Sequence, residues 1–378
     1  MSDLLARALG PLAEHPTLRK GDRVLAAMSG GVDSSVMAAL LHRAGYEVIG
    51  ISMQLFDKTG LGPGAEGRCC TLDDFQDARR VAFEQGFPHY VLDFEARFKA
   101  FVIEGFIEGY ERGETPSPCI RCNQHLKFDA LMTRADALGA AFVATGHYAR
   151  ITGGPGGWQL RKAQDQAKDQ SYYLFHHTQA TLPRTLFPLA HLTKPQVREV
   201  GRELGLHLTE KAESQEICFV GDQRYDAFLE AQGRAPASGP GRLRFLDGRD
   251  AGQHEGYWRF TVGQRKGLGI AHAEPLYVVR VEPATNTVWV GTERDLWADR
   301  LQVREPSWVA ETPRHPLPCS ARIRSRGVDA EALVIPLGDG TVQVSFAEPQ
   351  RAPAPGQAVV FYQGDEVLGG GWIAASNL

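Results

Sequence analysis

The chain has 378 residues, of which 43% are hydrophobic and 23% charged, a composition that suits a globular protein of two or three domains. Its net charge of −4 gives no overall basic signature for nucleic-acid binding, so such a function has to rest on local patches. No apolar run approaches the ~20 residues of a membrane helix and no signal pattern opens the chain, so we expect a cytoplasmic protein. The six cysteines include a Cys-Cys pair and a C-x-x-C, which fit thiol, redox or metal chemistry better than a disulfide scaffold.

The first strongly patterned segment is VLAAMSGGVDSSVMAALL, residues 24–41. The apolar pattern predicts a buried strand at Val24–Met28 and a helix at Ser34–Ala44. The loop between them therefore lies at a helix N-terminus, where free N–H groups and the helix dipole attract an anion. Its two glycines let the backbone approach that anion, and Ser29, Ser34 and Ser35 offer hydroxyl donors. A strand–helix turn with a Ser/Asp cap is the plainer alternative, but the complete SGGVDSS favours phosphate binding. The loop lacks the Walker A lysine and resembles the PP-loop of the ATP pyrophosphatase superfamily.

Apolar runs and helical patterns alternate from Gly21 to about Gly205, which predicts an α/β fold with a parallel sheet and ligands beyond its carboxyl ends. We expect further strands at Glu47–Met53, His89–Phe94 and Ala141–Thr145. We expect helices at Leu72–Gln85, Glu95–Tyr110 and Gln124–Leu138. The glycine-rich segment Lys58–Arg68 is expected to be a mobile excursion.

After about Lys211 helical patterning fades and short strand-like pieces follow: YWRFTVG, PLYVVRVE, NTVWVG, ALVIPL, TVQVSF and QAVVFY. Turn residues separate these pieces, as in small β-rich or barrel domains. We expect a catalytic domain at 1–211, a small central domain at 212–275 with a surface loop at 232–242, and a C-terminal β-barrel at 276–378.

The segment TPSPCIRCNQHLKFDAL, residues 115–131, places Cys119 and Cys122 just before a helix expected to start near Asn123. A helix N-terminus and the adjacent Arg121 lower a thiol pKa, so a reactive thiolate is expected. The alternative, half of a structural zinc site, lacks a second cysteine or histidine pair at suitable spacing. Cys218 lies about a hundred residues on, and taken alone would more often be a buried structural cysteine.

Together with this segment and the phosphate loop, the motifs VATGHYARI, KDQSYYLF, SQEICFVG and FTVGQRKGLGI follow in one order. Through these motifs and their order, the chain resembles the tRNA-specific 2-thiouridylase family from about residue 20 to the C-terminus. The resemblance implies a PP-loop domain, a small central domain and a C-terminal β-barrel. It also implies an ATP- and Mg²⁺-dependent transferase that thiolates the wobble uridine (position 34) of tRNAs for Lys, Glu and Gln, with sulfur from a persulfide donor.

The resemblance assigns the persulfide carrier to Cys218 and the nucleophile to Cys122, which would release the sulfur through a transient disulfide or activate it as a thiol. Some family members have an aspartate, assigned as a general base, where this chain has Cys119. A [4Fe–4S] cluster on Cys119, Cys122 and Cys218 is therefore an alternative, because related tRNA thiolases use three cysteines in that way. The persulfide mechanism on Cys218 and Cys122, called the relay below, is favoured, since it needs only the two cysteines that match the family's motif. Cys69 and Cys70 receive no role.

Two further sets of residues carry over from the resemblance. The ATP-binding set is Ala27, Met28, Ser29, Gly30, Gly31, Val32, Asp33, Ser34, Met53 and Gly146. The set that contacts the target base or tRNA is Ser117, Pro118, Cys119, His147, Lys168, Asp169, Gln170, Arg265, Lys266, Arg324, Ser325 and Gln357.

Several of these residues have plainer explanations. Met53 could be plain core packing, His147 a satisfied histidine rather than a residue at the rim of the site, and Asp169 a helix N-cap. The alternating arginines of ARIRSRG, residues 321–327, are expected to share one strand face, which is either solvated or bound to tRNA. Ser325 departs from relatives that have an aromatic residue there.

A second function class is a PP-loop ligase that forms an amide or guanidino group on a small metabolite. The paired Cys122 and Cys218 favour sulfur transfer instead. Amidotransferases of that group also need a cysteine at the processed N-terminus, whereas Ser2 follows the first methionine here. A non-enzymatic binding module would leave the nucleotide loop unexplained.

Overall fold

The computed structural model describes residues 2–13, 15–56, 71–154, 157–212, 217–220, 224–234 and 239–377. It divides into a first compact unit (residues 1–102, 119–222 and 365–367) and a second one (103–118, 223–364 and 368–378). The glycine-rich segment 58–68, Cys69, Cys70 and part of the expected loop at 232–242 lie outside the described residues. Within the described ranges, no helix is both long and apolar enough to span a membrane.

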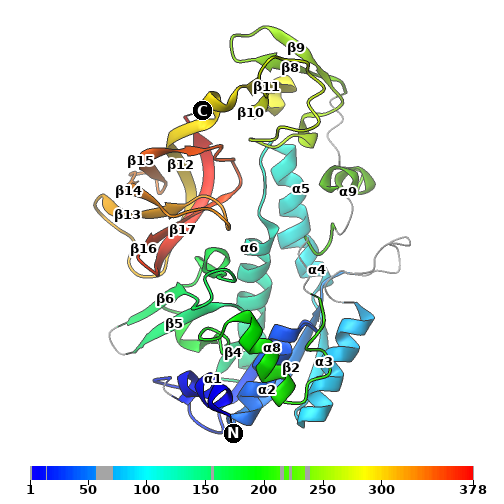
Figure 1. Ribbon diagram of the computed structural model, residues 1–378, viewed down its shortest axis with the longest axis vertical. Helices are drawn as coiled ribbons and strands as arrows, with labels where there is room; N and C mark the ends of the chain where they lie inside the picture. The colour runs from blue at the N-terminus through cyan, green and yellow to red at the C-terminus, as the bar shows by residue number, and fades with distance from the viewer. Residues whose placement is uncertain are drawn as a thin grey trace. The chain divides into compact units, whose positions relative to one another are not determined.

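The first unit is built on a parallel sheet with the strand order β3-β2-β1-β4-β7. Two of its strands, β2 and β4, are labelled in Figure 1. Its strands are β1 (Arg23–Ala27), β2 (Glu47–Gln54), β3 (His89–Asp93), β4 (Phe142–Ala144) and β7 (Thr185–Leu186). The central strands read as continuous apolar runs because both faces of a parallel sheet are covered. The parallel α/β sheet expected from the sequence is confirmed, and the two-residue β7 is too short to have produced a pattern.

Helices cover both faces of this sheet. α2 (Val32–Arg43) connects β1 to β2, and α3 (Leu72–Gln85), which packs against α2, connects β2 to β3. α8 (Lys194–Glu203) also packs against α2. α1 (Asp3–Ala13) packs against α2 and α8. α7 (Leu131–Ala137) contacts β1 and β4 and belongs to the crossover that returns to the other side of β1, so it lies on the opposite face. α2 is apolar on nearly every side because it is enclosed by the sheet and these helices.

Two helical stretches of the chain contain π-helical turns. α4 (Glu95–Phe98) continues into η1 (Lys99–Ile103) and α5 (Glu104–Glu111), and α6 (Pro118–Cys122) continues into η2 (Asn123–Ala130) and α7. The expectation that Cys119 and Cys122 precede a helix is wrong: both lie within α6, because Pro118 is already preset for the first helical position. π-turns inside helices are common at functional sites.

A hairpin completes the first unit. β5 (Ala149–Gly154) pairs with β6 (Gly157–Lys162), and Glu366 and Val367 add to the free edge of β6. Arg150 and Arg161 both form ion pairs with Asp365, which fixes this short return of the chain. Two short 3-10 turns, η3 (Ser171–Leu174) and η4 (Leu182–Arg184), link the hairpin to β7.

The central part of the second unit is a sheet with the order β10-β11-β8-β9. Its strands are β8 (Gly241–Phe245), β9 (Asp250–His254), β10 (Tyr277–Glu282) and β11 (Thr287–Gly291), and α9 (Tyr225–Ala231) precedes them. β10 and β11, grouped by the sequence pattern with the C-terminal strands, thus hydrogen-bond within this central sheet. YWRFTVG is not a strand but a 3-10 turn, η5 (Tyr257–Arg259), followed by further turns, because its large side chains fill the core from an irregular backbone.

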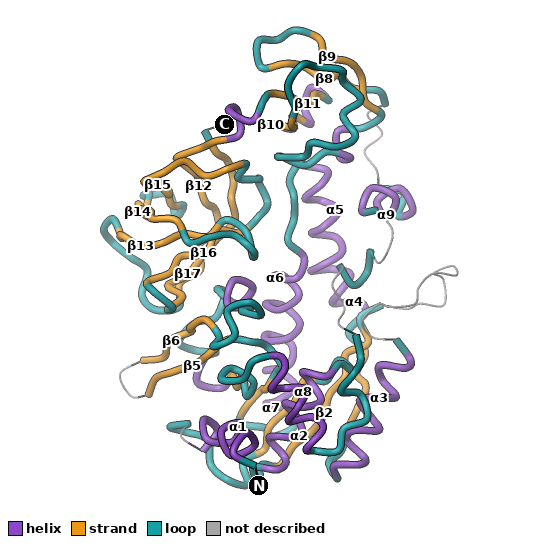
Figure 2. Tube along the Cα trace, in the orientation of Figure 1, coloured by secondary structure: helices purple, strands orange, loops and turns teal. Residues whose placement is uncertain are grey.

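The last part of the second unit is a closed barrel of antiparallel strands, drawn as orange strands in Figure 2. The strands are β12 (Trp297–Trp308), β13 (Leu317–Arg322), β14 (Ala330–Pro336), β15 (Val342–Arg351), β16 (Ala358–Gln363) and β17 (Glu366–Ser376). They follow the order β12-β15-β14-β13-β16-β17, and β12 pairs with β17 to close the barrel. Alternate side chains fill the interior, among them Val303, Val344 and Phe361. The C-terminal β-barrel expected from the sequence is confirmed.

Candidate nucleotide and sulfur-transfer site

The SGGVDSS loop lies at the point where the order of the parallel sheet reverses. β1 is flanked by β2 on one side and β4 on the other, so the loops after β1 and β4 both lie at this switch point on the carboxyl edge of the sheet. Ligands of doubly wound sheets bind at this position. The loop after β1 also forms the N-terminus of α2, whose first N–H groups have no carbonyl within the helix to bond. An anion is therefore favoured here by both the topology and the helix dipole.

Two glycines of the site are required by close backbone contacts. Gly30 has a φ of +73°, and a Cβ added to it would lie 2.2 Å from the carbonyl oxygen of Asp74. A Cβ on Gly146 would lie 2.9 Å from the backbone nitrogen of Ser34. The loop after β4 thus lies directly on the first turn of α2, which places Gly146 beside the anion-binding end of the helix.

The hydroxyls of the loop divide into two groups. The Ser34 hydroxyl lies 3.2 Å from that of Ser29 and donates to the Gly31 carbonyl, which holds the loop in shape. Ser29 is exposed and available to a ligand. Ser35, expected to offer a donor, is fully buried, because its position on α2 faces the core; that expectation is corrected.

Asp33 receives three hydrogen bonds that the sequence did not predict. Lys194 Nζ lies 2.7 and 2.8 Å from its two carboxylate oxygens, and the Tyr148 hydroxyl donates to Oδ1 at 2.8 Å. Tyr148 follows β4, and Lys194 is the first residue of α8. A lysine at a helix N-terminus opposes the helix dipole, and that unfavourable placement was the available signal for a special role.

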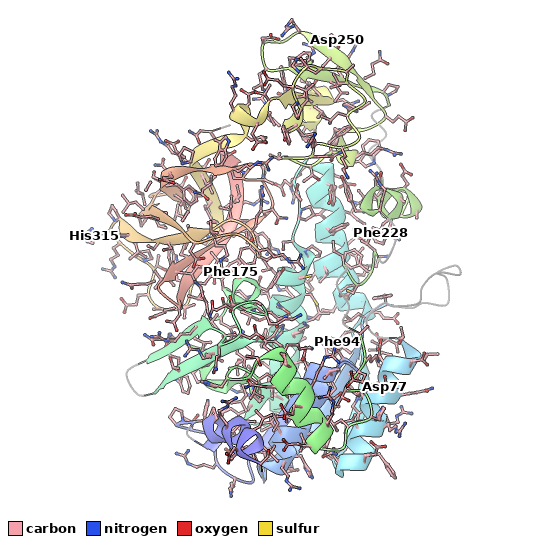
Figure 3. The ribbon with its side chains drawn as sticks, viewed as in Figure 1. Asp77, Phe94, Phe175, Phe228, Asp250 and His315 are labelled. Atoms are coloured by element: carbon pink, nitrogen blue, oxygen red, sulfur yellow. The ribbon has the colours of Figure 1, made fainter. Side chains whose placement is uncertain are left out.

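A second lysine, Lys211, fixes the outer side of the loop. Its Nζ donates to the Gly30 carbonyl at 3.0 Å and to Asp74 and Asp77 of α3 at 2.8 and 2.5 Å; Asp77 is labelled in Figure 3. Burial raises the pKa of Asp77, but hydrogen bonds from Lys211 and His207 outweigh that effect and give a net lowered pKa. For Lys211, burial lowers the pKa and its two aspartates raise it, with a net increase. Lys211 therefore links the loop to α3 through one hydrogen bond and two ion pairs.

Met53, expected to contact adenine, lies near the end of β2 and is partly exposed. Its neighbour Ser52 is fully buried and donates to the Met28 carbonyl at 2.8 Å. His89 bonds the same hydroxyl, and burial lowers its pKa to about 4, so it is neutral at physiological pH. Ala27 and Met28 are buried, so of the expected ATP-binding set they can offer only backbone atoms.

The segments that hold the two predicted sulfur-transfer cysteines, Cys122 and Cys218, both pack against the α4–η1 helix. Phe219 is buried next to Cys218 and packs against Phe98, with ring centroids 5.7 Å apart. On the other segment, His125 stacks on Phe101 at 4.8 Å and its carbonyl accepts from Arg97 at 3.2 Å. His125 lies on η2, which continues directly from Cys122. The fold therefore attaches two segments about a hundred residues apart to one helix.

The thiols differ in exposure. Cys119 is exposed, whereas Cys122 and Cys218 are partly buried, and the structure contains no disulfide among them. Cys319 on β13 has a pKa raised to about 12 by burial, so it stays a protonated thiol at physiological pH. Within the described part of the chain, no three His, Cys, Asp or Glu side chains are arranged to hold a metal ion.

His147 was expected at the rim of the site, and the structure corrects this. It is 7% exposed, hydrogen-bonds the Thr145 hydroxyl at 2.7 Å and packs beside Phe128 and Phe187. Burial lowers its pKa well below the ordinary value, so the ring is neutral. The side chain turns inward because the tight turn after β4 places it under η2 rather than toward solvent.

The segment Lys168–Gln170 forms a fixed turn before η3. Asp169 accepts from the Ala163 backbone at 3.0 Å and from the Ser171 hydroxyl at 2.8 Å. Gln170 exchanges backbone and side-chain bonds with Tyr148, the residue that also donates to Asp33. The helix expected after this triplet is a single 3-10 turn. Lys168 is the member of the triplet with a long cationic side chain, and its predicted contact with tRNA stays a prediction.

In the second unit, the segment before the cysteines is fixed to the barrel. The Gln357 side chain donates to the Thr115 carbonyl at 2.7 Å, and the Thr115 N–H donates to the Pro355 carbonyl at 2.7 Å. Arg304 and Glu114 form a paired ion contact at 2.7 and 2.9 Å. Gln357 therefore holds Thr115, two residues before Ser117. Pro118 is buried.

The arginine face expected from ARIRSRG does not form. β13 ends at Arg322, which pairs with Asp329 at 2.6 Å and lies over the Tyr362 ring. Arg324 and Arg326 follow in a turn, where alternation no longer places side chains on one face. Arg324 is exposed and donates to the Arg351 and Ala352 carbonyls at 3.0 and 2.6 Å. Arg265 and Lys266 are exposed in a glycine-rich turn.

Comparison with known proteins supports this picture. A family model described as the tRNA methyl transferase HUP domain matches residues 22–222. The tRNA methyl transferase PRC-barrel domain matches 227–292, and the aminomethyltransferase beta-barrel domain matches 298–373. A tRNA-specific 2-thiouridylase MnmA of Geobacter metallireducens is 50% identical over 359 residues, covering 94% of this chain and 97% of the relative.

The chain belongs to the tRNA-specific 2-thiouridylase family. Another 2-thiouridylase, from Rhodospirillum centenum, is 49% identical over 363 residues, covering 94% of this chain and 92% of the relative. The family resemblance read from the motifs is thereby confirmed, as is the three-part architecture of HUP domain, central domain and C-terminal barrel. The roles of individual residues stay predictions.

Proposed function

We propose that the chain is a tRNA-uridine 2-sulfurtransferase (EC 2.8.1.13) that converts the wobble uridine at position 34 of tRNA to 2-thiouridine. The observation that carries the proposal is the phosphate-binding loop at the switch point of the sheet, in a chain whose Cys122 and Cys218 segments are attached to one helix. The close relatives, named tRNA-specific 2-thiouridylases, support the same activity. The proposed substrates, tRNA and ATP, are cytoplasmic, so we propose that compartment for the enzyme.

In the first half-reaction the C2 oxygen of uracil attacks the α-phosphate of ATP, and pyrophosphate leaves with the bonding electron pair. The loop Ser29–Ser34 would hold the phosphates through the N–H groups of α2 and the exposed Ser29 hydroxyl. Gly146 would lie beside the nucleotide, and Met53 would contact the adenine. The adenylated oxygen is a good leaving group, which the carbonyl oxygen is not.

In the second half-reaction sulfur replaces AMP at C2. Cys218 would carry the sulfur as a persulfide, supplied by a partner such as a cysteine desulfurase or sulfur-relay protein. The Cys122 thiolate would attack the Sγ of Cys218, forming a Cys122–Cys218 disulfide and releasing hydrosulfide, which adds to C2 and expels AMP. A two-electron external reductant then returns both cysteines to thiols. In the alternative, Cys122 activates the persulfide for direct attack on C2.

Magnesium fits the site. One carboxylate together with substrate phosphates is a common Mg²⁺ environment, and Asp33 is the carboxylate that the loop offers. When bound, the ion neutralises phosphate charge and the charge developing on the leaving pyrophosphate. A [4Fe–4S] cluster does not fit the arrangement observed, because Cys119, Cys122 and Cys218 do not form a metal-holding group. We therefore assign no step to a cluster.

The proposed tRNA contacts fall in several places. Ser117, Pro118 and Cys119 precede or begin α6 and would lie at the target base. Lys168 from the fixed turn, with Arg265, Lys266 and Arg324, would contact phosphates. Asp169, Gln170 and Gln357 hold the segments that carry these contacts, and the buried His147 would act through its backbone. The proposed acceptors are the tRNAs for Lys, Glu and Gln.

The decisive experiment is reconstitution with unmodified tRNA, ATP, Mg²⁺, a persulfide donor and a reductant. Nucleoside mass spectrometry should detect 2-thiouridine at position 34, with stoichiometric AMP. Formation of an amide or guanidino product from a small metabolite, with no tRNA-dependent AMP, would refute the proposal.

Cysteine variants separate the two sulfur mechanisms within the same assay. In the relay, Cys122→Ser and Cys218→Ser each abolish 2-thiouridine, whereas the exposed Cys119→Ser retains activity because Cys119 carries no sulfur. In a cluster mechanism all three losses are comparable, since serine is a poor ligand for iron–sulfur centres. Activity that disappears on iron removal and returns on cluster reconstitution would overturn the relay while leaving tRNA thiolation intact.

A further inference from the structure

The ion pair between Lys194 and Asp33 places a cation on the phosphate-binding loop. Lys194 Nζ lies 2.7 Å from Asp33 Oδ1 and 2.8 Å from Oδ2, and Asp33 is the second residue of α2. The Lys194 side chain is only 10% exposed. The ammonium group is therefore held at the end of the helix where an anion is favoured.

The position of Lys194 is unfavourable for a cation in two respects. It is the first residue of α8, where the helix dipole disfavours a cation, and burial of a cation is unfavourable without a charged partner. The backbone at this point is fixed: its N–H donates to Asp165 at 2.9 Å, and Thr193 and Gln196 form a capping box. What can adjust is the four-carbon side chain, whose ammonium has three donors.

The charges around Asp33 change when a nucleotide binds. A triphosphate brings several negative charges to a loop that already carries the Asp33 carboxylate, so a neutralising cation must serve both anions. The Tyr148 hydroxyl bonds Asp33 Oδ1 at 2.8 Å, so the carboxylate keeps a partner when the lysine turns away. Lys211, in contrast, is bound to the Gly30 carbonyl and to Asp74 and Asp77 of α3, and so occupies the carbonyl side of the loop.

We infer that Lys194 is a phosphate ligand of the bound nucleotide: Asp33 holds its ammonium group before ATP binds, and the group then donates to oxygens of the β- and γ-phosphates. During adenylation the bond from the α-phosphate to the bridging oxygen breaks and its electron pair goes to pyrophosphate. Lys194 stabilises that growing negative charge by hydrogen bonding, without giving up a proton. This inference deepens the proposed function and rests on its ATP site.

The test measures the binding of inorganic pyrophosphate, ATP and adenosine by calorimetry, without tRNA. Lys194→Met should weaken pyrophosphate and ATP binding by about tenfold to a hundredfold, the loss expected for a charge-assisted hydrogen bond, and leave adenosine binding unchanged. Arg202→Met is the matched control, because it also removes a cation from α8. The Arg202 side chain is 56% exposed and paired with Glu210. This variant should leave all three affinities unchanged.

A second pair of variants separates direct contact from neutralisation of Asp33. Asp33→Asn removes the carboxylate, and Asp33→Asn with Lys194→Met removes both charges, a change that folded proteins usually tolerate. In magnesium-free buffer, the double variant should bind pyrophosphate about tenfold or more weakly than Asp33→Asn. Equal affinities of these two variants would overturn the inference. If the unmodified chain binds neither ATP nor pyrophosphate, the proposed function fails instead.

Discussion

Replacing Gly30 with alanine tests whether the phosphate loop is shaped by its contact with α3. Gly30 has a φ of +73°, and its added Cβ would lie 2.2 Å from the Asp74 carbonyl oxygen and 2.6 Å from the Asp74 Cα. Asp74 cannot move aside, because two hydrogen bonds of a capping box hold it. Its carboxylate accepts from the Thr71 N–H at 2.8 Å, and its own N–H donates to the Thr71 hydroxyl at 3.0 Å. The loop itself must therefore shift.

Gly205 provides a matched control. It has the same φ of +73°, but a Cβ there would meet nothing within 4 Å. Gly205→Ala should cost only the left-handed backbone term, about 1–2 kcal/mol. Gly30→Ala should add an overpacking term of about 1–3 kcal/mol, for a total of about 2–5 kcal/mol.

The assay compares urea unfolding and tRNA-dependent AMP release for the two variants. Gly30→Ala should be the less stable and should lose most AMP release, because the displaced loop no longer aims its N–H groups at the phosphates. Gly205→Ala should release AMP as the unmodified chain does. If both variants have the same unfolding midpoint and the same AMP release, the contact with Asp74 does not shape the loop.

Three further predictions follow from the charged contacts. Ser29→Ala should reduce AMP release with unchanged unfolding, because Ser29 is exposed. Asp33→Ala should also lower stability, because it removes the carboxylate that the buried Lys194 ammonium bonds; normal turnover in both variants would contradict the nucleotide assignment. Lys211→Met should lower the free energy of unfolding by about 1 kcal/mol. This difference is fully present above the ordinary aspartate pKa and is lost as the pH falls through the lowered pKa of Asp77. A difference in unfolding free energy that does not change at acid pH would refute the pairing of Lys211 with Asp77. Arg324→Ala should raise the tRNA dissociation constant and lower the salt slope by about one in filter binding, and unchanged binding across the salt series would contradict a phosphate contact from Arg324.

The sequence pattern was sufficient for the local elements whose apolar residues recur with a regular period. The strand before SGGVDSS, the helix after it and the helix Leu72–Gln85 occur where predicted, because each buries a face whose period the residues repeat. The pattern failed where tertiary packing replaced regular structure, as in YWRFTVG, whose aromatic side chains fill a core from a turn. It also failed at Arg322–Arg326, where a strand ends without a change in alternation.

The sequence by itself determined which groups the predicted chemistry rests on: two glycines and a carboxylate at a helix N-terminus, and the thiols of Cys122 and Cys218. Only the tertiary structure decided which distant groups complete the loop. Lys194 lies far along the chain from Asp33, and the parallel sheet brings them within 2.7 Å. Single-sequence patterns report the period of local burial, whereas an ion pair depends on the order of the strands and on the crossovers that place two helix ends together.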